Sequence, residues 1–238
     1  MTLNKDLHKT NFLNVLREIY SDPDLRTALG FKGGTAALLF YDLPRFSVDL
    51  DFDLLDPDKK EIVFEKIKAI LTKVGVLSDA SEKRYTLFYM LHYQKGERSL
   101  KVEISKRPLR SAYELKNHLG ISILVMKQPD MTAGKLSALL TRKKFASRDM
   151  FDLEFFLKNN WPIDEEVVKE KTGLSPKEAF KKAIKKVEAV NQEGLLEGLG
   201  ELLESEKQKA WVKTKLKDEL LFQLRLFEDS IKWSKRHP

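Results

Sequence analysis

Apolar positions in the first half of the chain follow the periods of both helices and strands. Residues 6–20 and residues 58–74 carry them at helical spacing, the second stretch after an Asp-Pro-Asp start. Shorter helices are expected around 24–29 and at 35–40. Between the helical stretches, residues 48–54 alternate strictly between apolar and acidic side chains. This alternation predicts a strand with one buried face and one polar face.

The next segments predict further strands and then only helices. Strands are expected at 84–93 and 99–105, which are spaced as a hairpin, and residues 121–126 are a strand or a buried connector. Every segment after Pro129 has helical spacing, and the expected helices are 130–143, 147–158, 164–171, 175–190, 193–204 and 208–234. This division predicts an α+β fold in two domains. Residues 1–127 would form a mixed sheet with flanking helices, and residues 128–238 a helical domain.

Composition excludes several classes of protein. The chain has 238 residues, of which 42% are hydrophobic and 33% charged, and it contains no cysteine. Disulfides, thiolate metal sites and a cysteine nucleophile are therefore excluded. No apolar run approaches the length of a membrane span, and the first residues lack the apolar core of an export signal. We expect a cytoplasmic protein without membrane contact.

The net charge of +7 is concentrated in one part of the chain. Residues 101–150 hold 11 basic and 4 acidic side chains, whereas the other blocks of fifty nearly balance. Such an excess favours binding of a polyanion, although a solvated basic face would have the same composition. The residues that could meet a polynucleotide are Lys106, Arg107, Arg110, Lys143 and Lys144.

Two carboxylates on the alternating strand indicate a metal site. Asp49 and Asp51 are two residues apart, so both project from the same face. Two adjacent carboxylates repel one another, and Mg²⁺ or Mn²⁺ would compensate them with oxygen ligands that it prefers. Glu103 could complete a triad if its strand lies beside residues 48–54. The alternatives are a solvent-facing charged strand and a Glu103 that pairs with Lys101 or Lys106.

A glycine pair precedes this strand. Gly33 and Gly34 lie at the start of the expected short helix, where free backbone N–H groups can bind phosphate. Thr35 could add a hydroxyl. Arg45 and Ser47 share the alternation of the aspartates and could meet a triphosphate if the strand begins early. A simple turn at the glycines, and a salt bridge from Arg45 to the aspartates, are the structural alternatives.

A second charged group lies on two helices of the second half. Lys135 and Arg142 share one helix face, and Asp149 and Asp152 are neighbours on the next helix. Lys135 could bind the leaving phosphates, and either aspartate could position Lys135 or act as base on the acceptor hydroxyl. A structural Lys/Arg–Asp network would have the same spacing.

These residues together resemble a known family. The run Lys32-Gly33-Gly34-Thr35, followed by Arg45-x-Ser47-x-Asp49-x-Asp51, is similar to the signature of the AbiEii-type nucleotidyltransferase toxins, which resemble DNA polymerase β. The downstream Lys135, Arg142 and Arg148-Asp149-x-x-Asp152 resemble the second motif of that family. The two motifs are about 85 residues apart and span about half of the chain.

The resemblance implies an N-terminal nucleotidyltransferase fold and metal-dependent transfer of a nucleotide from an NTP. RNA, including tRNA, is the implied acceptor, and a cognate antitoxin encoded nearby is the implied partner, with or without direct binding. Under this interpretation Asp49, Asp51 and Glu103 hold the metal, and Gly33, Gly34, Thr35, Arg45, Ser47 and Arg142 bind the nucleotide. Lys135, Asp149 and Asp152 join the catalytic set. The alternatives are a nucleotide- or RNA-binding module without catalysis, and a two-metal nuclease.

Overall fold

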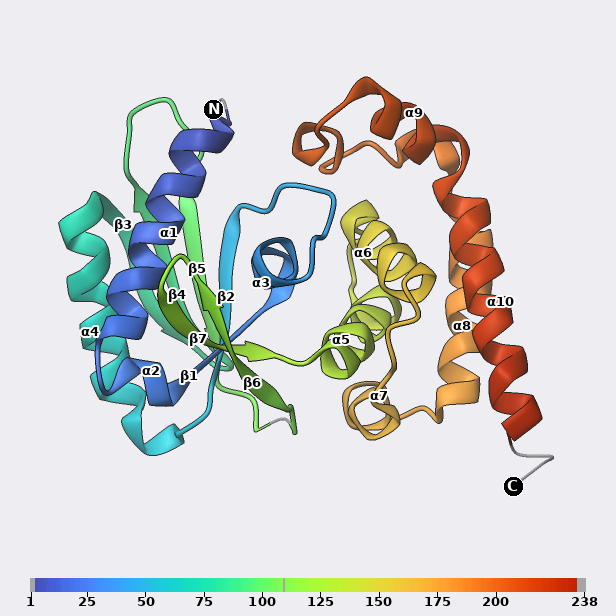
Figure 1. Ribbon diagram of the computed structural model, residues 1–238, viewed down its shortest axis with the longest axis horizontal. Coiled ribbons are helices and arrows are strands. Elements are labelled where there is room, and N and C mark those ends of the chain that lie inside the picture. The colour runs from blue at the N-terminus through green and yellow to red at the C-terminus, as the bar shows by residue number, and fades with distance from the viewer. Residues whose placement is uncertain (1–2, 109, 235–238) are drawn as a thin grey trace. The chain divides into compact units, whose positions relative to one another are not determined.

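A computed structural model describes residues 3–108 and 110–234 (Figure 1). Two compact units divide the chain. The first comprises Met1–Pro108 and Ala112–Met126, and the second comprises Leu109–Ser111 and Lys127–Pro238. Within the described ranges, no helix is both long enough and apolar enough to cross a bilayer.

The first unit is built on one mixed sheet of seven strands. The strand order across the sheet is β3-β4-β5-β2-β1-β7-β6. Strand β2 pairs in parallel with β5, and β1 pairs in parallel with β7, while the remaining pairs are antiparallel. The strands are β1 (Leu29–Lys32), β2 (Asp49–Leu54), β3 (Val76–Lys83), β4 (Thr86–His92), β5 (Leu100–Ser105), β6 (Tyr113–His118) and β7 (Ile121–Met126).

Helices cover the two faces of this sheet unequally. One face packs against α1 (Lys5–Ser21), α2 (Leu25–Ala28) and α4 (Lys60–Val74), whereas α3 (Gly33–Phe40) lies on the other face (Figure 1). The three-helix face is the hydrophobic core, because the alternate residues of β2, β4 and β5 that point to it are buried. The other face is therefore free to carry polar side chains along β2 and its neighbours.

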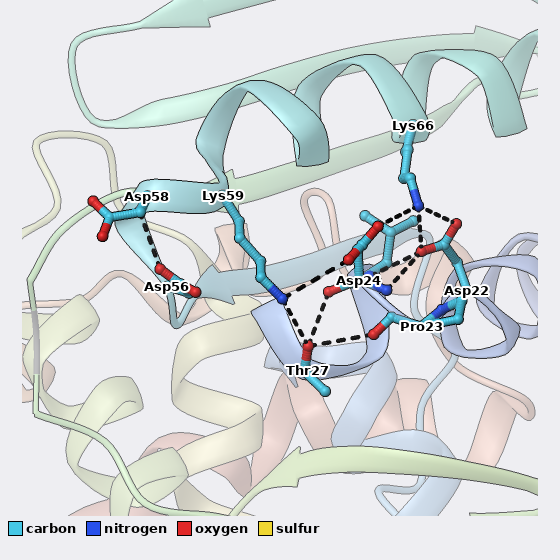
Figure 2. A network of polar contacts seen from close by, with 9 residues as sticks. Asp22, Pro23, Asp24, Thr27, Asp56, Asp58, Lys59 and Lys66 are labelled. Carbon is cyan, nitrogen blue, oxygen red and sulfur yellow. Dashed lines mark hydrogen bonds and ion pairs between the residues drawn. The ribbon is translucent and has the colours of Figure 1, made fainter.

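A surface network joins the helices of the covered face. Lys66 on α4 places its Nζ 2.8 Å from Asp22 Oδ2 and 2.6 Å from Asp24 Oδ2, at the turn that ends α1 and starts α2 (Figure 2). Lys59 Nζ lies 3.3 Å from the Thr27 hydroxyl on α2. Exposed ion pairs contribute little stability singly, so we assign this network a role in orienting α4.

The second unit is helical. Its elements are α5 (Gln128–Thr141), α6 (Ser147–Lys158), α7 (Glu165–Thr172), α8 (Pro176–Glu188), the 3-10 turns η2 (Gln192–Gly194) and η3 (Gly200–Leu202), α9 (Glu206–Thr214) and α10 (Leu216–Ser234). Ser175 and Glu178 form a complete capping box at the start of α8. Trp161 stacks on Phe156 with ring centroids 4.1 Å apart, and both side chains are buried.

The fold class expected from the sequence is confirmed, and the errors have physical causes. Strands β3 and β6 were not predicted because both lie at edges of the sheet, where half-exposed polar sequences carry little alternation. The helix expected at 193–204 is wrong, since Gly194, Gly198 and Gly200 break that segment into turns and 3-10 structure. The single helix expected at 208–234 is interrupted at Lys215, which separates α9 from α10.

Candidate functional site

Three aspartates form a row on the sheet face that α3 only partly covers. Asp49, Asp51 and Asp53 alternate on β2 with Leu50 and Phe52, which are fully buried in the core on the opposite face. The apolar residues fix the register of the strand, because a slip of one residue would bury the aspartates. We call Asp49, Asp51 and Asp53 the acidic row.

Strand β5 places a lysine and a fourth carboxylate beside the acidic row. In the parallel register, Asp49 is opposite Lys101 and Asp51 is opposite Glu103. The strand pairing on which the Glu103 hypothesis depended is therefore present. Lys101 Nζ lies 3.3 Å from Asp49 Oδ2 and 3.7 Å from Glu103 Oε1. Lys101 was not among the predicted site residues, although its position two residues before Glu103 places it on the same face.

Strand β1 supplies a second lysine on the other side of the row. Lys32 is opposite Asp51 in the register, and its Nζ pairs with the buried carboxylate of Asp53. The Tyr113 hydroxyl donates to the other oxygen of Asp53 at 2.6 Å. Gly30 makes room for this tyrosine, since a Cβ there would lie 2.2 Å from the ring. Asp53 is thus fully engaged in structural contacts, and the sequence had no signal that separated it from the other two aspartates.

Burial and the neighbouring carboxylates both disfavour ionisation of Asp51. Removal of its half-buried carboxyl from water raises the pKa, and the negative charges of Asp49 and Glu103 raise it further, to about 6. Lys32 and Lys101 oppose this rise but do not cancel it. The row therefore retains a capacity to bind additional positive charge.

The glycine pair packs directly against the site. Gly33 has a φ of +81°, and a Cβ built on it would lie 2.6 Å from Asp51 Oδ2. A Cβ on Gly34 would lie 2.7 Å from Arg45 Nη2 and 2.8 Å from Ser47 Oγ. Helix α3 begins at Gly33, two residues earlier than the helix expected from Thr35. Both glycines are thus required by the close approach of the chain's own side chains at the start of α3.

Three predicted nucleotide-binding residues lie inside this packing. Strand β2 begins only at Asp49, so Arg45 and Ser47 belong to the preceding loop, and the early strand start that would align them with the aspartates is wrong. Arg45 is buried, and its Nη1 donates to the Phe46 carbonyl at 2.8 Å. The buried Thr35 hydroxyl donates to the Asp49 carbonyl oxygen. Nucleotide binding by these three residues stays a prediction.

The donor set at the row fits a hard divalent cation. Asp49, Asp51 and Glu103 offer carboxylate oxygens from neighbouring positions of two strands, which is the ligand type that Mg²⁺ prefers. The ammonium of Lys101 stands between two of them as an internal cation. No three His, Asp or Glu side chains of the described ranges are already arranged to hold a metal. Metal binding would therefore require Lys101 to move.

The second motif forms a buried ion-pair network within the helical unit. Lys135 Nζ on α5 lies 3.1 Å from Asp149 Oδ1 and 2.7 Å from Asp152 Oδ2, both on α6. Arg142 Nε lies 3.1 Å from Asp149 Oδ2 at the end of α5. The two carboxylates are essentially inaccessible to solvent, while Arg142 is 44% exposed. This is the structural network that the spacing allowed, and a catalytic role for these residues stays a prediction.

The basic residues of the segment 101–150 differ in their surroundings. Lys106 pairs with Glu82, and the Arg110 backbone N–H donates to Glu170. Lys143 and Lys144 are exposed between α5 and α6. Part of the positive excess at 101–150 is therefore neutralised within the fold.

Comparison with known proteins identifies the family of the chain and relatives of its fold. A family model described as nucleotidyl transferase AbiEii toxin, type IV toxin–antitoxin system, matches residues 14–230. A crystal structure of a candidate nucleotidyltransferase from H. pylori has a TM-score of 0.63 at 20% identity, covering 98% of each chain. A crystal structure of JHP933 from Helicobacter pylori has a TM-score of 0.63 at 21% identity, covering 99% of this chain and 97% of that one. At these identities the structures establish the fold alone, and no curated protein matches.

We predict that Asp51→Asn raises the melting temperature of the metal-free protein near pH 7.5 by about 2–4 °C. Because the pKa of Asp51 is higher in the folded than in the unfolded state, its contribution to stability falls as pH rises from its ordinary value near 4 to about 6. Asparagine removes this loss, so the difference between variant and wild type should vanish near pH 4. Melting curves in EDTA from pH 4 to 8 measure it. Asp53→Asn is the matched control and should melt lower, since it loses the ion pair with Lys32.

We predict that Lys135→Ala lowers the free energy of unfolding by about 3–5 kcal/mol, because it removes the one ammonium that contacts both buried carboxylates, Asp149 and Asp152. Urea titration followed by tryptophan fluorescence is suitable, since all three tryptophans lie after residue 160. Lys177→Ala, on an exposed position of α8, is the control and should change little. A loss below 1 kcal/mol in Lys135→Ala would contradict a structural role for the network.

Proposed function

The chain belongs to the AbiEii nucleotidyl transferase toxin family, and we propose that it is a metal-dependent enzyme that transfers a nucleotide from an NTP to an RNA acceptor. Transfer RNA is one candidate acceptor. The observation that carries the proposal is the cluster of Asp49, Asp51 and Glu103 beside the N-terminus of α3. Its charge excess and its half-exposed carboxylates suit a cation that carries phosphates.

The proposed reaction is an in-line substitution at the α-phosphate. The acceptor hydroxyl oxygen forms a bond to the α-phosphorus, and the bond from that phosphorus to the oxygen bridging to the β-phosphate breaks. Pyrophosphate leaves, and the hydroxyl proton passes to a carboxylate base. Asp49, Asp51 and Glu103 would hold Mg²⁺ or Mn²⁺, which when bound supplies positive charge to the phosphates.

The chain's own residues would position the phosphates at the start of α3. Free backbone N–H groups of the first turn attract anions, and the positive end of the helix dipole adds to this. Lys101 would exchange its carboxylate partners for phosphate oxygens when the metal enters. This exchange leaves the Lys101 ammonium paired with an anion both before and after the metal enters.

The second motif and the antitoxin are separate parts of the proposal. Lys135, Arg142, Asp149 and Asp152 are proposed to support catalysis because they match the family motif, in addition to their structural network. Membership of a toxin–antitoxin family implies a cognate antitoxin. A small repressor-like protein encoded beside this chain would agree with that implication.

A binding module without catalysis is the second candidate. The observation that favours it is Lys101, which already compensates Asp49 and Glu103 without any metal. A binding module would retain NTP without releasing pyrophosphate. A transfer assay therefore separates the two candidates.

We predict that Asp49→Asn and Asp51→Asn each abolish transfer while the protein stays folded. The wild type is incubated with each α-labelled NTP, Mg²⁺ and total cell RNA, and a gel then separates labelled RNA from labelled protein. Asp58→Asn, an exposed aspartate near the other end of β2, is the matched control and should transfer normally. Full activity in either site variant would contradict the metal assignment.

We predict that Mn²⁺ raises the melting temperature of the wild type, because a ligand of the folded state stabilises it. Asp51→Asn should lose this rise, and Lys101→Met should show a larger rise at the same Mn²⁺ concentration, since no internal ammonium competes. Lys95→Met, on an exposed loop of the same unit, serves as the control. An equal rise in Asp51→Asn and wild type would place the cation elsewhere.

A further inference from the structure

We propose that the acceptor polynucleotide is held as a single strand at the end of the β3–β4 hairpin. We call this surface the hairpin-end cluster, and its members are Lys83, Arg84, Tyr85, Phe88 and Arg107. In this proposal bases stack on the two aromatic rings and the cations meet phosphates. The inference rests on the proposed function for the identity of its ligand.

The pairing of the strands places one ring of this cluster, that of Phe88, on the same sheet face as the acidic row. Phe88 on β4 is directly opposite Glu103 on β5, and Glu103 is directly opposite Asp51 on β2. The next residue of β4, Tyr89, is buried on the core face, so Phe88 points to the face of the carboxylates. Two strand spacings separate Phe88 from Asp51, a distance of roughly 10 Å. An RNA strand bound at Phe88 would thus lie one β-strand spacing from Glu103.

Cations cover both aromatic rings of the cluster. Lys83 Nζ lies 3.5 Å from the centroid of the Phe88 ring. The guanidinium carbons of Arg84 and Arg107 lie 4.9 Å and 5.0 Å from the centroid of the Tyr85 ring. Tyr85 is 43% exposed. Exposed cation–π contacts are weak, so a base can replace the cation on the ring while the cation turns to a phosphate.

The charge of the cluster is not neutralised by the fold. Among the described residues, no carboxylate forms an ion pair with Lys83, Arg84 or Arg107. The neighbouring Glu82 is already paired with Lys60, at 2.9 Å, and with Lys106. The Lys106 backbone N–H donates to the Tyr85 carbonyl at 2.8 Å, which holds the turn beside the end of β5. The hairpin end is therefore a fixed, positively charged surface.

Single-stranded nucleic acid fits this chemistry better than an acidic protein or a free nucleotide. Sites for single strands combine aromatic rings for stacking with cations that follow the phosphates. An acidic peptide would use the cations but leave both rings without a planar partner. A single NTP would present one base, whereas the cluster offers two rings with cations at each.

The test is binding of a fluorescein-labelled ten-nucleotide single-stranded RNA, followed by anisotropy at several salt concentrations. Arg84→Ala combined with Arg107→Ala should weaken binding at least tenfold and lower the slope of log affinity against log salt by about 1.4. Tyr85→Leu should weaken binding about tenfold with an unchanged slope, because it removes a ring and no charge. Phe88→Leu should act in the same way and keeps an apolar side chain in this half-buried position.

Matched controls separate this surface from general charge effects. Lys95→Ala removes one exposed cation at the opposite end of β4 and should change affinity little. Lys143→Ala combined with Lys144→Ala removes two exposed cations from the second unit. If that pair abolishes RNA binding while the hairpin variants bind as wild type does, the proposal is overturned. Melting temperatures of all variants confirm that each is folded.

Other outcomes also decide the proposal. If the hairpin variants lose affinity for a fluorescent NTP instead of RNA, the rings hold the base of the nucleotide and the proposal is overturned. If polyglutamate competes as strongly as RNA, the surface recognises charge alone and the same conclusion follows. Transfer by the wild type is measured separately, so that failure of the proposed function can be told apart from failure of the RNA-binding proposal. If the wild type transfers a nucleotide and the hairpin variants bind RNA as the wild type does, only the RNA-binding proposal is overturned. Absence of both transfer and RNA binding in the wild type removes the proposed function as well.

Discussion

The carboxylates on one face of β2 repel one another, and the residues at the centre of the first unit are arranged around this repulsion. Residues two apart on a strand are separated by about 7 Å, and two charges at that distance repel by about 2 kcal/mol at an effective dielectric constant of 20. Burial contributes most to the raised pKa of Asp51, and the charges of Asp49 and Glu103 raise that pKa further. Lys32 and Lys101 flank the row on both sides, and Gly33 leaves space for the Asp51 carboxylate.

The repulsion lowers the free energy of unfolding when no ligand is bound. Which carboxylates carry this cost helps to distinguish their roles. Asparagine has nearly the shape of aspartate and would relieve the repulsion without disturbing the core. Asp53 is different, since Lys32 and Tyr113 satisfy both of its oxygens. Asp49 and Glu103 share the ammonium of Lys101, and the negative charges of both raise the pKa of Asp51. These contacts assign Asp53 a structural role, and the proposed cation site is therefore limited to Asp49, Asp51 and Glu103.

The sequence was sufficient to predict the acidic strand, because burial of Leu50 and Phe52 is a local pattern of period two. It could not predict that Lys101 lies opposite Asp49, because that contact depends on the register between two strands about fifty residues apart. The burial of Arg45 against Gly34 was equally inaccessible, since it depends on how a loop folds over α3. The edge strand β3 lacks an alternating pattern and was missed for the same kind of reason.

The two groups of charged residues that form the motifs of this chain differ in physical character. In the helical unit, Lys135 and Arg142 match the two buried aspartates in charge, so each carboxylate is paired with a cation without a ligand. In the sheet unit, the carboxylates outnumber their lysines and are half-exposed. A complete buried network resists the entry of a new ion because any exchange leaves a charge unpaired in a poorly solvated place. The acidic row and Glu103 are more exposed and outnumber their lysines, so of the two groups this is the one at which we propose the metal site, with displacement of Lys101 as the step that the metal must drive.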